Sequence, residues 1–190
     1  MRIGIDFDNT IICYDEVFCT LAKSLGVIDS TFQGTKQSLR DHLHQSEEGD
    51  LIWQRLQGQV YGRWIDQAKV FVGFKEFMQK VSLDLQIQLF IVSHKTEYGH
   101  FDEAKINLRA VAKNWLKNQG VIPLIPEDHL FFESSREEKI ERIRSLNCTH
   151  FIDDLVEVFD DPHFPKEVKK ILFTPAVQNW ADITDVLLSN

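Results

Sequence analysis

The chain contains 190 residues, of which 43% are hydrophobic and 26% are charged, a composition typical of a globular domain. No apolar run approaches the roughly 20 residues that a membrane-spanning helix needs, and no basic segment followed by a long apolar region indicates a secretory signal. The net charge of -8 argues against the basic surface that binds polynucleotides or anionic membranes. We therefore expect a cytoplasmic protein whose partners include no nucleic acid polymer and no membrane.

Five short apolar runs are typical of buried strands, and they lie at residues 2–7, 86–92, 129–132, 150–152 and 170–173. The spacing of apolar residues predicts helices over residues 16–25, 36–43, 51–64, 74–81, 104–115 and 136–146, with a short helix through Val156 and Val158. Strands that alternate with helices imply right-handed crossovers between parallel strands. The predicted fold class is therefore α/β, with a three-layer, doubly wound parallel sheet.

The segment between the first two predicted strands is far longer than a single crossover helix requires. It contains four of the predicted helices, separated at Gly34, Gly49 and Gly73. We expect the last of these helices, 74–81, to pack on the sheet as the crossover. The sequence therefore predicts a core domain of residues 1–13 and 73–190, with a small helical insert of residues 14–72.

Polar side chains collect where three of the predicted strands end. They are Asp6, Asp8 and Thr10 after the first strand, Ser93, His94 and Lys95 after the second, and Asp153 and Asp154 after the fourth. In open α/β sheets, the loops at the carboxyl ends of the strands form the ligand crevice. We also single out Lys139, which lies on the helix before the fourth strand. Four elements far apart in the sequence would thus converge on one place.

Several carboxylates in one crevice repel one another and need a cation if all are to stay ionised. Hard oxygen ligands suit Mg²⁺, which also accepts a phosphate oxygen as a ligand. A carboxylate beside such a metal can attack phosphorus, and a second one two residues along can serve as the acid and base of the reaction. A serine hydroxyl and a lysine ammonium would then hold the phosphate oxygens as charge moves.

The chain resembles the phosphatase branch of the haloacid dehalogenase (HAD) superfamily. The DxDxT motif of that family appears as DFDNT at residues 6–10, a serine ends the strand in LFIVSHK, and an acidic pair ends the strand in THFIDDL. All three motifs occur in the family order. The resemblance implies a Rossmann-like core with the strand order 5-4-1-2-3. It also implies that the insert of residues 14–72 is a helical cap that closes over the substrate.

The resemblance implies that Asp6 is the nucleophile and Asp8 the acid/base. It also implies that Asp6, the main-chain carbonyl of Asp8 and Asp153 hold Mg²⁺, with Asp154 near or in the same shell. Many family members carry glycine where this chain has Asn9, and the hairpin that often follows the first strand is not evident.

Ser93 and Lys139 are expected to serve as catalytic residues that bind the phosphate. His94, which follows Ser93, and Asn9, which follows Asp8, are expected to contact the phosphate as well. The lysine motif has no strong local signature, so Lys139 is selected because it lies ahead of Asp153. Lys105 is the weaker competitor for the same role.

Each of these motifs also has a purely structural explanation. Asp, Asn and Thr in DFDNT could cap a helix, and the acidic pair Asp153 and Asp154 could cap the short helix that follows it. Their joint occurrence at separate strand ends favours a functional site, because each motif also sits in the context that its function requires.

We therefore predict a Mg²⁺-dependent phosphomonoester hydrolase that acts on a small phosphorylated metabolite, such as a nucleotide or a sugar phosphate. A phosphotransferase or phosphomutase of the same superfamily stays open as an alternative. So does a phospho-aspartate signalling module that turns over slowly. Response-regulator receivers, however, carry the acidic pair on the first strand and have no helical insert. The substrate, the oligomeric state and the cap residues that contact the substrate stay open.

Overall fold

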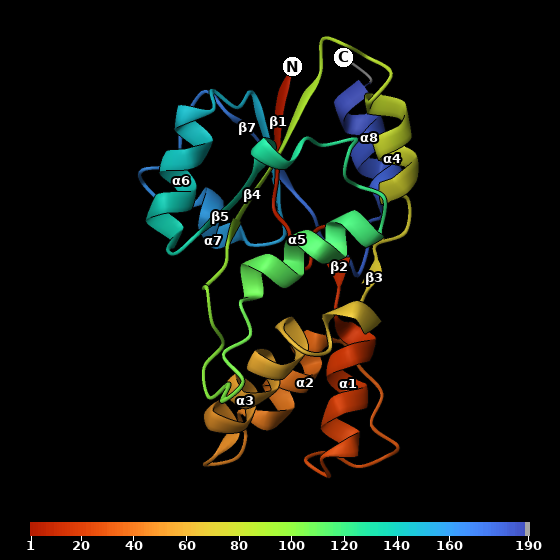
Figure 1. Ribbon diagram of the computed structural model, residues 1–190, viewed down its shortest axis with the longest axis vertical. Coiled ribbons are helices and arrows are strands. Elements are labelled where there is room, and N and C mark those ends of the chain that lie inside the picture. The colour runs from red at the N-terminus through yellow and green to blue at the C-terminus, as the bar shows by residue number, and fades with distance from the viewer. Residues whose placement is uncertain (189–190) are drawn as a thin grey trace. The chain divides into compact units, whose positions relative to one another are not determined.

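The computed structural model describes residues 1–188, which divide into two compact units (Figure 1). The first, here called the core unit, comprises Met1–Ile12, Val70–Thr96 and the described residues from Leu116 onward. The second, called the insert unit, comprises Cys13–Lys69 and Glu97–Trp115. The insert unit thus covers most of the expected range 14–72, and it also takes in a segment that follows the second predicted strand.

The core unit is built on a five-stranded sheet with the order β5-β4-β1-β6-β7. The strands are β1 (Arg2–Ile5), β4 (Gln88–His94), β5 (Leu130–Glu133), β6 (His150–Asp153) and β7 (Lys169–Leu172). All four pairings between them are parallel. Counted from the other edge, this is the expected order 5-4-1-2-3. Both the α/β fold class and the sheet topology are confirmed.

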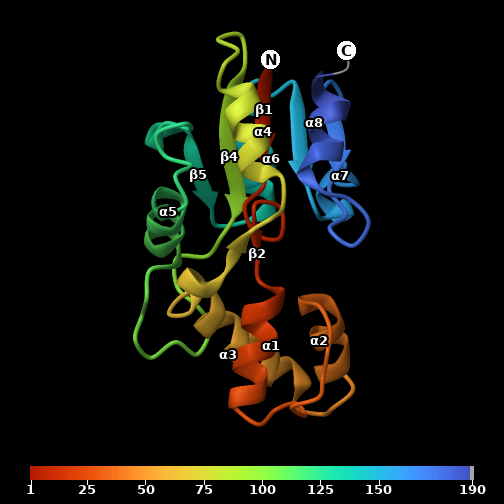
Figure 2. The ribbon, with the colours of Figure 1, turned by 90° about the vertical axis from the view of Figure 1, so that its right-hand side faces the viewer.

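Helices cover both faces of this sheet, as Figures 1 and 2 show. One face carries α6 (Arg136–Ser145) and the short α7 (Val156–Phe159), and the other carries α4 (Phe74–Val81) and α8 (Trp180–Leu188). The layer under α6 and α7 contains the buried Phe151, which needs a glycine opposite it. A Cβ atom on Gly4 would lie 2.5 Å from the Phe151 ring. The Phe151 ring of β6 can therefore lie over the neighbouring strand β1 at the centre of the core unit.

The helix α8 has no counterpart among the predicted elements. Its residue Trp180 is fully buried, and its ring lies 4.8 Å from those of Phe74 and Phe77. The Trp180 indole also donates a hydrogen bond of 2.9 Å to the carbonyl of Thr10, in the loop that follows β1. The apolar spacing of Trp180, Ile183 and Leu187 is the sequence signal that could have revealed this helix.

The insert unit contains α1 (Asp15–Ser24), α2 (Lys36–Leu43), α3 (Gly49–Tyr61), the 3-10 turn η1 (Ile65–Gln67) and most of α5 (Leu108–Asn118). The three helices expected at 16–25, 36–43 and 51–64 are therefore present, the third ending earlier than expected. They pack through aromatic side chains, with the Phe18 and Trp53 rings stacked 4.8 Å apart. Thr35 caps α2 by accepting a hydrogen bond of 3.2 Å from the Ser38 N–H.

The helix expected at 104–115 begins only at Leu108, so that prediction is wrong over its first turn. The Asp102 carboxylate accepts hydrogen bonds from the N–H groups of Ala104 and Ile106 and holds these residues in a turn. Asn107 then accepts a hydrogen bond of 2.9 Å from the Ala110 N–H, as a helix cap does. Side-chain caps of this kind compete locally with the helical pattern.

Two glycines explain why the segment after β4 belongs to the insert unit. Gly58 of α3 and Gly99 face each other, and a Cβ atom on Gly99 would lie 2.8 Å from the Cα atom of Gly58. A Cβ atom on Gly58 would lie 2.7 Å from the His100 carbonyl oxygen. The loop therefore approaches the helix more closely than any side chain would allow.

Two further short strands, β2 (Ile12–Cys13) and β3 (Lys69–Val70), form a separate two-stranded sheet. No hairpin was expected after the first strand, and β2 and β3 are joined only through the long insert. The short 3-10 turn η2 (Glu127–His129) precedes β5. Within residues 1–188, no helix combines the length and the apolar character that crossing a membrane requires.

Candidate active site

The loop after β1 carries the first two acidic candidates. The Asp6 N–H still donates to the Ile152 carbonyl at 2.9 Å, which continues the pairing of β1 with β6. The chain then turns back, since the N–H groups of Ile11 and Ile12 both donate to the Phe7 carbonyl. Asn9 lies in this turn with a φ of 60°, in the left-handed region. Asparagine enters that region more readily than most residues, which explains how it can stand where many HAD proteins have glycine.

Three carboxylates meet at the ends of β1 and β6. Asp6, Asp153 and Asp154 each offer an oxygen atom, and these atoms lie within 4.8 Å of one another. Asp6 and Asp153 are buried, and Asp154 is half-buried. Hard oxygen donors at this spacing fit a Mg²⁺ ion, which accepts one or two carboxylates and completes its shell with water and phosphate oxygens. The carbonyl of Asp8 stays a predicted ligand.

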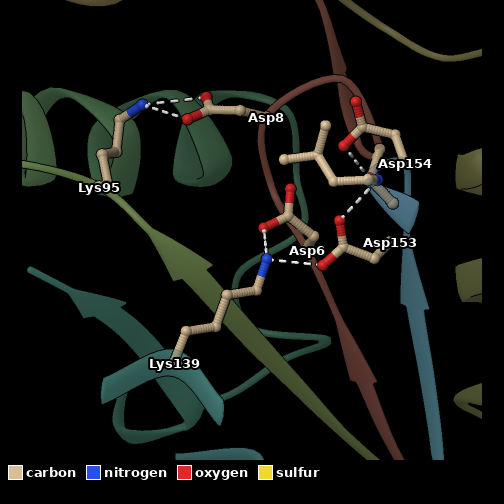
Figure 3. A network of polar contacts seen from close by, with 8 residues as sticks. Asp6, Asp8, Lys95, Lys139, Asp153 and Asp154 are labelled. Carbon is tan, nitrogen blue, oxygen red and sulfur yellow. Dashed lines mark hydrogen bonds and ion pairs between the residues drawn. The ribbon is translucent and has the colours of Figure 1, made fainter. Parts of the chain in front are cut away.

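Lys139 extends from α6 into this cluster (Figure 3). Its Nζ atom donates hydrogen bonds of 2.6 Å to Oδ1 of Asp6 and to Oδ2 of Asp153. The side chain is only 2% exposed. Burial lowers the pKa of Lys139, but Asp6 and Asp153 outweigh that effect and raise the pKa above its ordinary value, so the ammonium stays charged. The competitor Lys105 is instead an exposed residue of the insert unit.

The cluster contains more negative charge than Lys139 neutralises. Burial raises the pKa of Asp6 above its ordinary range; Lys139 opposes the shift, and the carboxylates of Asp153, Asp154 and Asp8 add to it. Such a group ionises readily only when further positive charge comes close to it. The electrostatics of the site thus favour binding of a divalent cation.

Ser93 is the second-last residue of β4, and its hydroxyl is the feature that indicates a ligand. The side chain is 1% exposed, and its Oγ atom is the one buried side-chain polar atom without a hydrogen-bond partner in residues 1–188. An unsatisfied buried hydroxyl costs about 1–3 kcal/mol. A phosphate oxygen is a partner that would remove this cost.

His94, which was expected to contact the phosphate, lies on the opposite face of β4 from Ser93. Its ring is exposed, and Nε2 lies 3.1 Å from the carbonyl oxygen of Ser134. Successive residues of a strand point to opposite faces, so His94 and Ser93 do not share a face of β4. The structure therefore ties the His94 ring to the loop after β5. Its role in phosphate binding stays a prediction.

Lys95 is a site residue to which the sequence reasoning assigned no role. Its Nζ atom donates to both carboxylate oxygens of Asp8, each at 2.9 Å (Figure 3). The Lys95 side chain is 2% exposed, and that of Asp8 is 19% exposed. The signal for it was the strand period, because Lys95 follows Ser93 by two residues and so continues the same face of the strand.

No family model matches the chain, and no curated protein sequence matches it. Solved structures do match over nearly its whole length. A HAD-superfamily hydrolase from Ehrlichia chaffeensis has a TM-score of 0.58 and 14% identity, covering 99% of this chain and 96% of its own. A candidate HAD hydrolase from Bacillus subtilis, bound to magnesium, has a TM-score of 0.55 and 13% identity, with coverages of 98% and 97%.

A HAD-family hydrolase from Deinococcus radiodurans, with bound phosphate and sodium, has a TM-score of 0.52 and 12% identity, covering 99% of this chain and 95% of its own. At these identities the likeness concerns the fold. The chain has the fold of the HAD-superfamily hydrolases, so the family resemblance read from the motifs is confirmed at the level of the fold.

Proposed function

We propose that this protein is a Mg²⁺-dependent phosphomonoester hydrolase of the HAD superfamily, acting on a small phosphorylated metabolite through an aspartyl-phosphate on Asp6. The observation that carries the proposal is the meeting of three carboxylates and a buried lysine next to the strand that bears an unsatisfied serine hydroxyl. Related folds that hold magnesium or phosphate support the same reading.

The carboxylates of Asp6, Asp153 and Asp154 would hold the metal, together with the main-chain carbonyl of Asp8. Their donor chemistry fits Mg²⁺. When bound, Mg²⁺ supplies positive charge that offsets the repulsion between these carboxylates and a phosphate dianion.

Asp6 and Asp8 would carry out the bond-making and proton-transfer steps of the reaction. An Asp6 oxygen attacks phosphorus, and the bond between phosphorus and the ester oxygen breaks as Asp8 gives a proton to the leaving alkoxide. Asp8, now a carboxylate, takes a proton from a water molecule that attacks the phosphorus of the aspartyl-phosphate. Cleavage of the bond between phosphorus and the Asp6 oxygen then releases phosphate and restores the Asp6 carboxylate.

Two further side chains would stabilise the charge during these steps. The Ser93 hydroxyl donates to a phosphate oxygen, for which its lack of another partner leaves it available. The Lys139 ammonium keeps Asp6 and Asp153 together and orients the attacking oxygen. We propose that the insert unit serves as the cap that selects the substrate.

The direct test is hydrolysis of an aryl phosphate with and without Mg²⁺, followed by a screen of phosphorylated nucleotides, sugars and related metabolites. We expect turnover that requires Mg²⁺ and disappears when EDTA is added. The Asp6→Asn variant should be inactive, and an acid-quenched wild-type reaction should contain protein-bound phosphate. Full activity in Asp6→Asn, or an unchanged rate in EDTA, would refute the mechanism.

A further inference from the structure

We propose that Lys95 is a positioning residue, which fixes the carboxylate of Asp8 in the orientation needed for proton transfer. This inference rests on the proposed function, in which Asp8 handles the protons of both steps. Lys95 itself would touch neither the phosphate nor the leaving group. Its effect on the reaction would pass entirely through Asp8.

The contact between the two residues has the geometry of an orienting clamp. One ammonium group donates to both oxygens of the Asp8 carboxylate at equal distances of 2.9 Å. Two equal bonds centre the ammonium group between the two oxygens and fix the direction in which the carboxylate points, which a single bond would define less closely. A carboxylate oxygen can take part in more than one hydrogen bond, so a carboxylate held in this way can still take part in proton transfer.

Burial of Lys95 makes the clamp stiff. The side chain is 2% exposed, and its Nζ atom lies 5.3 Å from the centre of the Phe7 ring. In the sequence, Phe7 stands between Asp6 and Asp8. The main-chain N–H of Lys95 also donates a hydrogen bond of 2.8 Å to the Glu133 carbonyl, which extends the pairing of β4 with β5. The backbone that carries Lys95 is therefore part of the sheet.

Stability alone does not account for a buried lysine at this position. The desolvation of two charges largely cancels their attraction, so a buried ion pair is weak evidence for a stabilising role. The site also contains a separate lysine for the nucleophile, since Lys139 bonds to Asp6 and Asp153. Lys139 thus holds the proposed nucleophile Asp6, and Lys95 holds the proposed acid/base Asp8.

Orientation matters here because proton transfer requires a heavy-atom distance of about 2.6–3.2 Å. A displacement of about 1 Å of a catalytic group can lower the rate by about 10²-fold. Without Lys95, the Asp8 carboxylate would lose the two hydrogen bonds that fix its direction. We therefore expect Lys95→Met to lower kcat by roughly 10- to 100-fold, while KM changes less than about 3-fold.

A double-mutant cycle tests whether Lys95 acts through Asp8. We would measure kcat and KM for Lys95→Met, Asp8→Asn and the double variant, with Mg²⁺ and an aryl phosphate. If the inference is right, Lys95→Met causes no further loss of kcat in the Asp8→Asn background. Lys95→Arg should recover part of the rate, because a guanidinium also donates to both oxygens. Lys75→Met, at an exposed lysine of α4, is the matched control.

Two kinetic outcomes would overturn the inference. If the two losses multiply in the double variant, Lys95 acts independently of Asp8. If Lys95→Met raises KM and leaves kcat unchanged, Lys95 binds substrate instead. Either result leaves the proposed function intact as long as Asp6→Asn is inactive, whereas an active Asp6→Asn refutes the proposed function whatever the cycle shows.

Crystal structures of wild-type and Lys95→Met protein, grown with Mg²⁺, give a readout that needs no activity. We expect the Asp8 carboxylate to leave its wild-type rotamer in the variant. An unchanged Asp8 rotamer would contradict the inference. Should Lys95→Met fail to fold, as judged by its circular dichroism, Lys95→Arg and Lys95→Gln would be compared in the same way.

Discussion

Replacement of Lys139 by methionine tests the electrostatic account of the site most directly. Lys139 is 2% exposed and donates two hydrogen bonds of 2.6 Å, one to Asp6 and one to Asp153. Methionine preserves much of the volume and removes the charge. The substitution would leave two buried carboxylates facing each other without the ammonium between them.

The structure allows a rough magnitude. A hydrogen bond to a charged group contributes about 1.5–3 kcal/mol, so two of them amount to about 3–6 kcal/mol. Breaking a buried ion pair by removing one partner costs about 3–5 kcal/mol, which agrees with that range. Protonation of Asp6 would limit the loss, because burial already raises its pKa. We expect a loss of about 3–4 kcal/mol from the free energy of unfolding.

The assay is urea unfolding in EDTA, monitored by tryptophan fluorescence, alongside kcat for an aryl phosphate with Mg²⁺. Lys139→Met should also lower kcat by about 10²- to 10³-fold, since Asp6 loses the group that orients it. The control is Lys105→Met at the exposed lysine of the insert unit, which should change stability by less than about 0.5 kcal/mol.

Two results would refute the reasoning. A stability loss below about 1 kcal/mol in Lys139→Met would show that the carboxylates do not depend on this ammonium. Loss of activity in Lys105→Met with retention in Lys139→Met would transfer the role of the lysine motif to Lys105.

Three further predictions follow from individual contacts. Mg²⁺ at 100 times its dissociation constant should stabilise the protein by about 2.7 kcal/mol, seen as a Tm rise that EDTA reverses and that Asp153→Asn lacks. Ser93→Ala should lower kcat by about 10²-fold while leaving the free energy of unfolding unchanged or higher, because it removes an unsatisfied buried hydroxyl; a lower stability would contradict this. Gly58→Ala should destabilise the protein by about 1 kcal/mol, since the clash with the His100 carbonyl outweighs the helix propensity gained; Gln54→Ala on the same helix is the control, and a rise in Tm for Gly58→Ala would refute the close approach.

The fold could be read from the sequence where the pattern was local and periodic. The helix predicted at 74–81 is α4, because its apolar residues recur at helical spacing and a left-handed glycine, Gly73, stands before it. Prediction failed where local side chains opposed the pattern, as at residues 104–107, which Asp102 holds in a turn. It also failed at the C-terminal helix, although Trp180 and the apolar residues after it carry the spacing of a buried helix.

In the site, too, the residues that a local pattern marks could be predicted, and those placed by long-range packing could not. The acidic candidates follow strand ends, and the parallel sheet alone brings Asp6 and Asp153 together. The position of Lys139 depends on how α6 packs on the sheet, which no local pattern records, whereas the two-residue period of β4 does place Lys95 on the face of Ser93. Lys139 was selected by its place in the order of motifs, while Lys95 was passed over despite sharing the face of Ser93.

The two lysines also explain how an acidic protein can bind an anion. Four aspartates, Asp6, Asp8, Asp153 and Asp154, form the site, and two buried ammonium groups contact three of them. With all four carboxylates ionised, two negative charges are left over, which is the charge that one divalent cation neutralises. With Asp8 protonated, as the first step of the proposed reaction requires, a phosphate dianion would meet a site with one net positive charge, although the chain as a whole carries -8. Removal of either lysine should therefore tighten the dependence of phosphate binding on Mg²⁺, because only one ammonium group and the metal would remain to compensate the carboxylates.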